Sequence, residues 1–270
     1  FDLKLTREML KQMKPITDTR PISSLVNTHA NGDHCYGNQL VGDARIIASA
    51  KTAEEMQEML PGSMAALMKQ AAHLGALGAF ASRAFAPFDF ENITLVPPTQ
   101  TFEEQLTVHV GAKAVHLLEV GPAHTRGDTL VYVPSDRVIF TGDILFIEGH
   151  PIIWAGPVGN WIRACETILS LDVETIVPGH GPITDKQGVK RLKGYFEYLF
   201  DEVSRCYHAG LSVLEAAMTI PMDAYAAWLD PERVAINVAS IYRELGSEHE
   251  YTGTLALFGL MAEYAQQAGL

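Results

Sequence analysis

The chain has 270 residues, of which 20 are basic and 32 acidic, so its formal net charge is −12 at neutral pH. Apolar residues make up 47% and charged residues 19%, which is typical of a globular protein and too apolar for a disordered one. Proteins that neutralise nucleic-acid phosphates carry a basic face, so this charge disfavours a nucleic-acid partner. The sequence contains no uninterrupted apolar run of ~18 residues, so we also expect no membrane partner.

Cysteine use and the N-terminal residues give an expectation about the cell compartment. The three cysteines, Cys35, Cys165 and Cys206, are too few and too scattered for a disulfide framework. No charged and then apolar leader precedes Phe1, so the sequence shows no signal peptide. We therefore expect free thiols and a cytoplasmic location.

The N-terminal part of the chain predicts a mixture of helices and short strands. Apolar spacing favours a helix over 1–14 that Pro15 ends, and a buried strand over 22–27. A second strand is expected at 44–48, and a helix over 52–60 in which Thr52 and Glu55 form a capping box. The segment 63–85 is rich in Ala, Met and Leu, which fits an apolar flap over the active site and plain core packing equally well.

The remainder of the chain changes from strands to helices. Alternating and apolar runs predict four strands, at 107–110, 115–120, 129–133 and 138–141, with a turn at 134–136 between the last two. A helix over 158–171 and a strand over 175–177 follow. The C-terminal helices are expected at 186–209, 212–219, 225–229, 231–245 and 252–267, with Pro231 at the first helical position of its helix.

Four short segments rich in His, Asp and Gly each follow an apolar strand. They are 28–34, 121–128, 141–143 and 178–181. Loops that leave one edge of a sheet converge, so ligands far apart in sequence meet there. Imidazole and carboxylate together are the usual ligands of zinc or a similar transition ion. Each segment alone is a weak signal, but four in order at strand ends predict a metal site.

The order and spacing of these motifs resemble the metallo-β-lactamase-fold hydrolase superfamily over about residues 24–183. The resemblance implies an α+β fold, a four-layer αββα sandwich, with a catalytic domain over 1–185. It also implies a C-terminal helical region over 186–270 that caps the active-site edge, as in glyoxalase II-like members. The family fold begins with several strands before its first motif, and only 28 residues precede His29. We expect the missing segment to lie outside this chain, to have been cleaved, or to belong to another chain.

The resemblance also implies a set of metal ligands. One ion would take His29, His124 and Asn31, the other would take Asp33, His34 and His180, and Asp143 would bridge them. The family's first motif has a second histidine where this chain has Asn31. Asn31 is either a weaker ligand, because an amide oxygen is a poorer donor than imidazole, or a residue that only hydrogen-bonds the loop. The expected cofactor is Zn²⁺, one or two ions per chain, with Fe and Mn as alternatives.

The resemblance implies hydrolysis of an activated acyl group. A metal ion lowers the pKa of bound water to about 7, and the resulting hydroxide attacks the acyl carbon. Asp33 is the candidate catalytic residue, orienting the water or acting as general base. Trp154 and Trp161 are expected to stack on the substrate. Together with the apolar segment 63–85, they favour a thioester or ester of a bulky apolar acyl chain, either a small molecule or carrier-bound.

Two other functions stay open. The segment 29–38 also resembles metallo-β-lactamase-fold members of bacterial aromatic polyketide pathways. Those proteins act as cyclases or thioesterases, and a cyclase would form carbon–carbon bonds through a metal-stabilised enolate. The second alternative is a metal-binding member of the fold without catalysis. The sequence does not indicate the oligomeric state.

Overall fold

The computed structural model describes residues 1–58, 60–248 and 251–270. It separates the chain into two compact units, Phe1–Glu104 and Gln105–Leu270. This division differs from the expected boundary between residues 185 and 186. The helix that follows residue 185 packs against the helix before it and against a later one, so this boundary falls inside the second unit.

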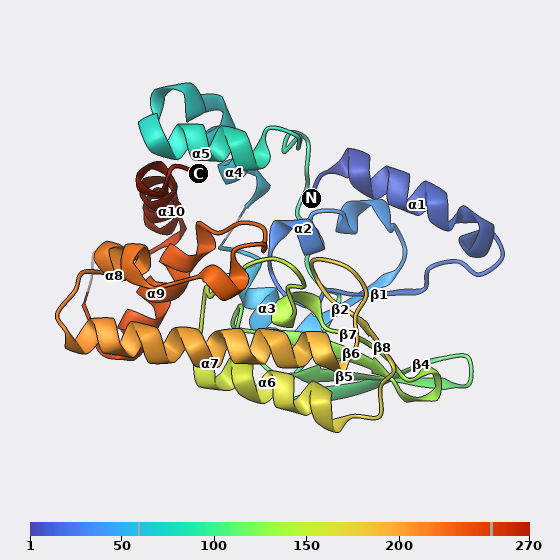
Figure 1. Ribbon diagram of the computed structural model, residues 1–270. Helices are drawn as coiled ribbons and strands as arrows, with labels where there is room; N and C mark the ends of the chain where they lie inside the picture. The colour runs from blue at the N-terminus through green and yellow to red at the C-terminus, as the bar shows by residue number, and fades with distance from the viewer. Residues whose placement is uncertain (59, 249–250) are drawn as a thin grey trace. The chain divides into compact units, whose positions relative to one another are not determined.

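The first unit contains a three-stranded parallel sheet (Figure 1). Its strands are β1 (Ser24–Val26), β2 (Arg45–Ser49) and β3 (Gln100–Phe102), in that spatial order. The central strand is the most buried, with Ile46, Ile47 and Ala48 almost inaccessible to solvent. The first two strands confirm the predictions, although β1 is half-buried rather than buried. No strand was predicted at β3, since three residues are too few to show alternation.

The helices of the first unit are short. They are α1 (Leu3–Thr17), α2 (Gly32–Cys35), α3 (Ala50–Glu55), α4 (Pro61–Gln70) and α5 (Gly75–Phe85), with 3₁₀ turns η1 (Asn38–Leu40) and η2 (Ala71–His73). Pro15 was wrongly predicted to end the first helix. Pro15 has no amide hydrogen to donate, but the helix continues past it, and the Asp18 amide donates to the Lys14 carbonyl at 3.0 Å, which closes the last turn.

The predicted capping box at Thr52 is also wrong. The helix α3 begins one turn earlier than expected, because Ser49 is its N-cap and accepts a hydrogen bond from the Thr52 amide at 3.1 Å. Thr52 therefore lies inside the helix, which ends at Glu55. Residue 59, which the prediction included, is outside the described residues.

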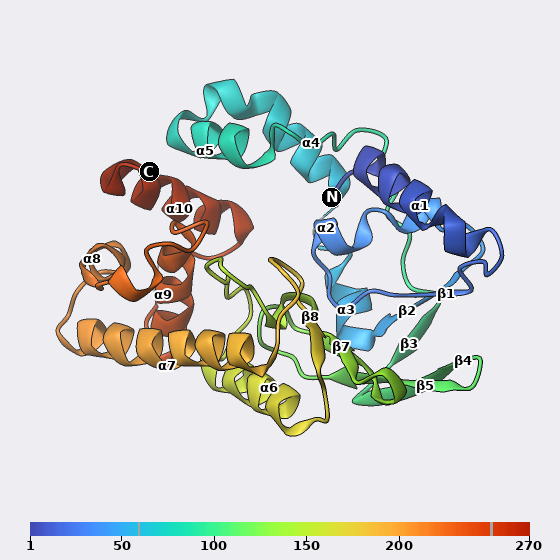
Figure 2. The same ribbon diagram turned by 45° about the vertical axis from the view of Figure 1, so that its right-hand side comes forward.

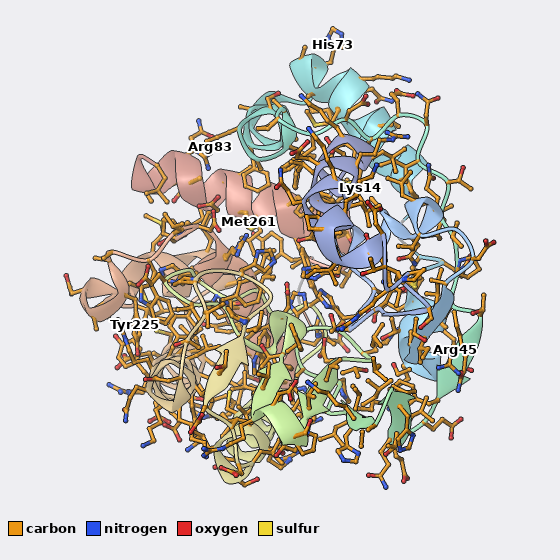
Figure 3. All side chains as sticks on the ribbon, turned by 90° about the vertical axis from the view of Figure 1, so that its right-hand side faces the viewer. Lys14, Arg45, His73, Arg83, Tyr225 and Met261 are labelled. Carbon is orange, nitrogen blue, oxygen red and sulfur yellow. The ribbon has the colours of Figure 1, made fainter. Side chains whose placement is uncertain are left out.

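The apolar segment of the first unit folds as α4 and α5, which lie side by side (Figures 1 and 2). Met64, Leu67 and Phe80 are buried, which agrees with a packing role for one face of each helix. Between the helices, His73 points outward from the η2 turn and is exposed (Figure 3). The role of this segment as a flap stays a prediction.

The second unit is built on a five-stranded sheet. Its strands, in spatial order, are β4 (Gln105–Val110), β5 (Lys113–Glu119), β6 (Thr129–Val133), β7 (Val138–Phe140) and β8 (Thr175–Val177). The first four are antiparallel, with short turns between β4 and β5 and between β6 and β7 and a longer loop between β5 and β6, whereas β8 runs parallel to β7. A parallel neighbour needs a long crossover, and the helix between β7 and β8 supplies it. All five strands and the turn at 134–136 confirm the predictions.

Helices cover the second unit and form its core with the sheet. They are α6 (Val158–Ser170), α7 (Lys186–His208), α8 (Val213–Thr219), α9 (Arg233–Glu244) and α10 (Thr254–Ala268), with 3₁₀ turns η3 (Pro134–Asp136), η4 (Gly142–Ile144) and η5 (Asp223–Tyr225). In Figure 1, α6 and α7 run side by side. Buried residues recur along α7 every three or four positions, at Val189, Leu192, Phe196 and Leu199, as an amphipathic helix requires.

Two details of the predicted C-terminal helices are wrong. The segment 225–229 is not a helix, because the Leu229 amide donates to the Glu148 carbonyl and its carbonyl accepts from the His150 amide. Pro231 is not the first helical residue, since α9 begins at Arg233 with Glu232 as its N-cap. Among the described residues, none of the helices is both long enough and apolar enough for a membrane crossing. The three cysteines are buried free thiols, as predicted.

Candidate metal centre

Asp143 lies between two histidines of the second unit. It sits on the η4 turn directly after β7 and is only 3% exposed. Its Oδ2 atom is 3.4 Å from Nε2 of His124 and 3.1 Å from Nε2 of His180. His124 follows β5 and His180 follows β8, so three predicted ligands from three separate loops meet here.

Each of the two histidine nitrogens lies at a distance from Asp143 that fits a pair of ligands on one transition-metal ion. Zinc binds imidazole nitrogen and carboxylate oxygen at about 2.0–2.2 Å, which places neighbouring ligand atoms of a tetrahedral site about 3.4 Å apart. The two observed separations, 3.4 and 3.1 Å, are close to that value. Imidazole nitrogen and carboxylate oxygen are also donor atoms that such an ion prefers.

The environment of His124 fixes which ring nitrogen is available to a metal. Its Nδ1 atom lies 2.7 Å from the Ile152 carbonyl oxygen. A carbonyl only accepts hydrogen bonds, so Nδ1 carries the proton and donates it. When the ring is neutral, its lone pair is therefore on Nε2, the nitrogen that faces Asp143. Metal-ligating histidines are held in this way by a backbone carbonyl behind the ring.

His180 forms the exposed edge of the group. Its side chain is 39% exposed, whereas the Asp143 and His124 side chains are buried. The His180 ring stacks on Phe146, with centroids 4.8 Å apart and planes 8° apart. The Ile147 amide also donates to the His180 carbonyl at 3.0 Å. These contacts fix the ring while leaving it accessible.

The loop that carries His124 is closed by Asp128, which the sequence placed in the same motif. The Asp128 carboxylate is buried and accepts hydrogen bonds from the Thr125 amide and from the Thr125 hydroxyl, the latter at 2.7 Å. The Asp128 carbonyl accepts from the Val120 and Gly121 amides. Asp128 therefore shapes the loop.

The first unit carries a second group of histidine and carboxylate side chains. His29 precedes the short helix α2, which holds Asp33 and His34. The ring centroids of His29 and His34 are 4.2 Å apart, and Asp33 Oδ2 is 3.3 Å from His34 Nε2. Behind His29, the Thr28 hydroxyl lies 3.0 Å from Nδ1. Asn31, in the middle of the same motif, is the N-cap of α2, but its side chain makes no capping hydrogen bond.

Two buried asparagines fix this group, and the sequence reasoning missed them. The side-chain amides of Asn27 and Asn38 exchange hydrogen bonds at 3.1 and 2.9 Å, and Asn27 also donates to the His34 carbonyl at 2.9 Å. The end of β1 is thereby tied to α2. The sequence signal for Asn27 was its position at the end of a predicted strand, next to the first His- and Asp-rich motif. A neutral amide at such a position does not by itself indicate a buried hydrogen-bonding role.

The two tryptophans predicted to contact substrate have different surroundings. Trp161 is fully buried, donates from Nε1 to the Ile144 carbonyl at 2.9 Å and packs on Phe196. Its assignment to substrate stacking is therefore wrong, and it belongs to the core. Trp154 is partly exposed and its amide donates to the His124 carbonyl at 3.1 Å. Its role in binding substrate stays a prediction.

Known proteins similar to this chain share its fold. A curated relative, the 2,4-dinitroanisole O-demethylase subunit alpha of Nocardioides sp. (strain JS1661), is 30% identical over 95 residues, which are 32% of this chain and 26% of that protein. The stereoselective inverting sec-alkylsulfatase Pisa1 from Pseudomonas sp. is 16% identical with a TM-score of 0.61, covering 98% of this chain and 44% of that one. A metallo-beta-lactamase from Pontibacter korlensis is 18% identical with a TM-score of 0.51, covering 71% and 76%.

The matched segment is thus about a quarter of the demethylase subunit, and the matched structure less than half of the alkylsulfatase chain. At these identities the structural matches establish the fold alone. The family model described as the metallo-beta-lactamase superfamily matches residues 17–180, more than half of the chain. The chain belongs to the metallo-beta-lactamase superfamily.

Proposed function

We propose that the protein is a metal-dependent hydrolase that acts on an activated acyl group. The observation that carries this proposal is Asp143 placed within 3.4 Å of two imidazole nitrogens, one of them held in the metal-ligating tautomer. Membership of a superfamily of metal-dependent hydrolases supports it. We propose Zn²⁺ as the ion, one or two per chain.

Both groups of histidine and carboxylate side chains are proposed to supply ligands. The proposed ligands are His29, Asp33, His34, His124, Asp143 and His180, with Asn31 as the varied position. This assignment carries the family's motif order over to the chain residue by residue. The short distances within each group support it.

A bound zinc ion lowers the pKa of a coordinated water and polarises an acyl carbonyl. The side chains of the protein supply the remaining functions. The buried Asp143 carboxylate would balance part of the positive charge of the ion, and His124 would bind through Nε2 with Nδ1 hydrogen-bonded to the Ile152 carbonyl. Asp33 keeps 29% of its side chain exposed, so it is available to accept a proton from the attacking water as general base.

We propose a thioester or ester of an apolar acyl chain as the substrate. The apolar composition of helices α4 and α5 in the first unit supports an apolar substrate. Independently, Trp154 of the second unit is partly exposed and available to an apolar group. The names of the similar proteins show that this fold also hosts enzymes acting on a nitroaryl ether and on secondary alkyl sulfates. Both bond types therefore belong in the assay beside thioesters and esters.

Metal analysis combined with a substrate panel tests the proposal. We expect the purified protein to contain zinc and to hydrolyse acyl thioesters, and His180→Ala to lose both properties. His109→Ala is the matched control, because His109 is an exposed histidine of β4 outside the four motifs and outside the segment 63–85. A metal-free wild-type protein, or equal rates for His180→Ala and wild type, contradicts the proposal. Release of a cyclised product from a poly-β-ketone thioester would instead identify a cyclase.

A further inference from the structure

The helix α9 carries a line of polar side chains on an otherwise buried helix. We call this line the α9 ridge, and its members are Arg233, Asn237, Ser240, Arg243 and Glu244. Their spacing of three or four residues places them on one side of the helix. The helix is buried over residues 234–242, and Asn237 is 0% exposed. Polar side chains in such a place need hydrogen-bond partners within the protein.

The partners of the α9 ridge are backbone groups of the loop 150–157 and of Val158, the first residue of α6. The hydrogen bonds are Arg233 Nη1 to the His150 carbonyl (3.0 Å), Asn237 Nδ2 to the Pro151 carbonyl (2.9 Å), the Ile153 amide to Asn237 Oδ1 (2.9 Å), Ser240 Oγ to the Ile153 carbonyl (2.5 Å), Arg243 Nη2 to the Trp154 carbonyl (3.2 Å) and the Val158 amide to Glu244 (2.9 Å). The ridge thus replaces the backbone pairing that a strand or helix would give this loop.

The same loop also forms hydrogen bonds with His124. The Ile152 carbonyl accepts from His124 Nδ1, and the amides of Trp154 and Ala155 both donate to the His124 carbonyl at 3.1 Å. Both neighbours of Ile152 are hydrogen-bonded to the ridge, and the Ile153 amide belongs to the same peptide group as the Ile152 carbonyl. Asn237 bonds the Pro151 carbonyl on one side and the Ile153 amide on the other. The peptide group that orients the His124 ring is therefore clamped from both sides by one side chain.

The side-chain amide of Asn237 makes three hydrogen bonds. Its Oδ1 accepts from Ile153, and its Nδ2 donates to Pro151 and, at 3.1 Å, to the Tyr195 hydroxyl. We infer that Asn237, supported by Ser240, is the positioning residue for His124. It fixes the Ile152 carbonyl, and thereby the ring orientation and tautomer that present Nε2 to a metal. This inference rests on the proposed function, in which His124 is a zinc ligand.

Three variants test the inference. Asn237→Leu keeps the approximate size of the side chain and removes its hydrogen bonds to the loop. Ser240→Ala is the milder variant, removing one hydrogen bond to Ile153. Tyr242→Phe is the matched control, since Tyr242 lies on the same helix and its hydroxyl donates to the Leu211 carbonyl, away from the loop.

The first readout is the imidazole ¹H–¹⁵N spectrum of the metal-free protein, and the second is Zn²⁺ affinity from competition with a chromophoric chelator. We expect a protonated Nδ1 for His124 in wild type and in Tyr242→Phe, and loss of that signal in Asn237→Leu. Loss of a partner behind a metal ligand weakens binding by about 10–100-fold, so we expect that decrease for Asn237→Leu. Ser240→Ala is expected to weaken binding in the same direction, with Tyr242→Phe at the wild-type value.

Two results overturn the inference. One is an Asn237→Leu protein, or a Ser240→Ala protein if the former does not fold, that keeps both the Nδ1 signal and the wild-type Zn²⁺ affinity. The other is a loss of Zn²⁺ affinity in Tyr242→Phe as large as that in Asn237→Leu, which would show that any destabilisation of α9 weakens Zn²⁺ binding. Failure of the proposed function looks different. A wild-type protein that binds no Zn²⁺, but whose His124 Nδ1 signal depends on Asn237, refutes the metal centre and supports the positioning contact.

Discussion

The tightest constraint on Asp143 comes from a glycine, and replacing it gives a sharp prediction. Gly179 follows β8, and its amide donates to the Gly142 carbonyl at 2.8 Å. A Cβ atom at position 179 would lie 2.0 Å from Asp143 Oδ1 and 2.7 Å from the Gly142 carbonyl carbon. No side chain fits this space, so Gly179→Ala must displace the Asp143 carboxylate.

The size of that displacement follows from the distances. Carbon and oxygen do not approach closer than about 3 Å, so the carboxylate must move by about 1 Å. Metal–ligand distances tolerate about 0.2 Å, so a shift of this size removes Asp143 from a shared ion. We expect at least a 10–100-fold loss of Zn²⁺ affinity, comparable to losing a group that orients a ligand. Overpacking a buried site also lowers the free energy of unfolding by about 1–3 kcal/mol.

The assay pairs chelator competition with urea unfolding of the metal-free protein, and Gly194→Ala is the matched control. Gly194 lies inside α7, and a Cβ there meets nothing within 4 Å. Alanine in a helix interior is favoured over glycine, so the control should keep its Zn²⁺ affinity and gain about 0.5–1 kcal/mol. Wild-type affinity in Gly179→Ala would refute the reasoning, because the close approach of Gly179 to Asp143 would then not constrain the carboxylate.

Three further predictions concern groups outside that contact. Burial, reinforced by the nearby Arg233 cation, lowers the pKa of His150 to about 4, so between pH 6.5 and 4 the unfolded chain takes up a proton that the folded chain does not. As the pH is lowered from 6.5 to 4, His150 should therefore reduce the free energy of unfolding by about 3 kcal/mol. Urea titrations of His150→Gln should show a correspondingly smaller decrease over the same pH range. Burial raises the pKa of the Cys35 and Cys165 thiols to about 12, so a thiol reagent should label both only after unfolding; labelling of the native protein at pH 8 would contradict this. Asn31→His restores the family's imidazole and should raise Zn²⁺ affinity in chelator competition, whereas an unchanged affinity would show that the Asn31 side chain only hydrogen-bonds its loop.

The elements that could be predicted from the sequence are those with a clear apolar period. Burial alternates along most of β4, and along α7 it recurs every three or four residues, so both patterns are visible in the sequence. The errors lie where local hydrogen bonds compete with those patterns. Ser49 rather than Thr52 caps α3, and Leu229 pairs with the loop at 148–150 rather than continuing a helix.

The candidate site was predictable for a different reason. Ionisable side chains at strand ends, such as Asp143 and His180, are conspicuous in a sequence, and sheet geometry brings such ends together. What supports them was not predictable. Asn27 and Asn237 act through bonds to backbone groups 7 and more than 80 residues away, and neutral amides have no pattern that marks such partners. The error at Trp161 has the same origin, since an aromatic residue in a loop or helix shows no sign of burial.

These long-range bonds explain why the boundary expected at residue 185 does not divide the structure. From the sequence, the C-terminal helices are expected to form a region separate from the catalytic domain, because they follow the last motif and have their own helical period. In the structure, α9 supplies hydrogen bonds to the loop 150–157 and to Val158 that no strand or helix of that loop provides. The loop in turn orients His124. A truncation at residue 185 would leave those backbone groups without partners and His124 without a fixed tautomer, so the helices are a condition for the orientation of His124.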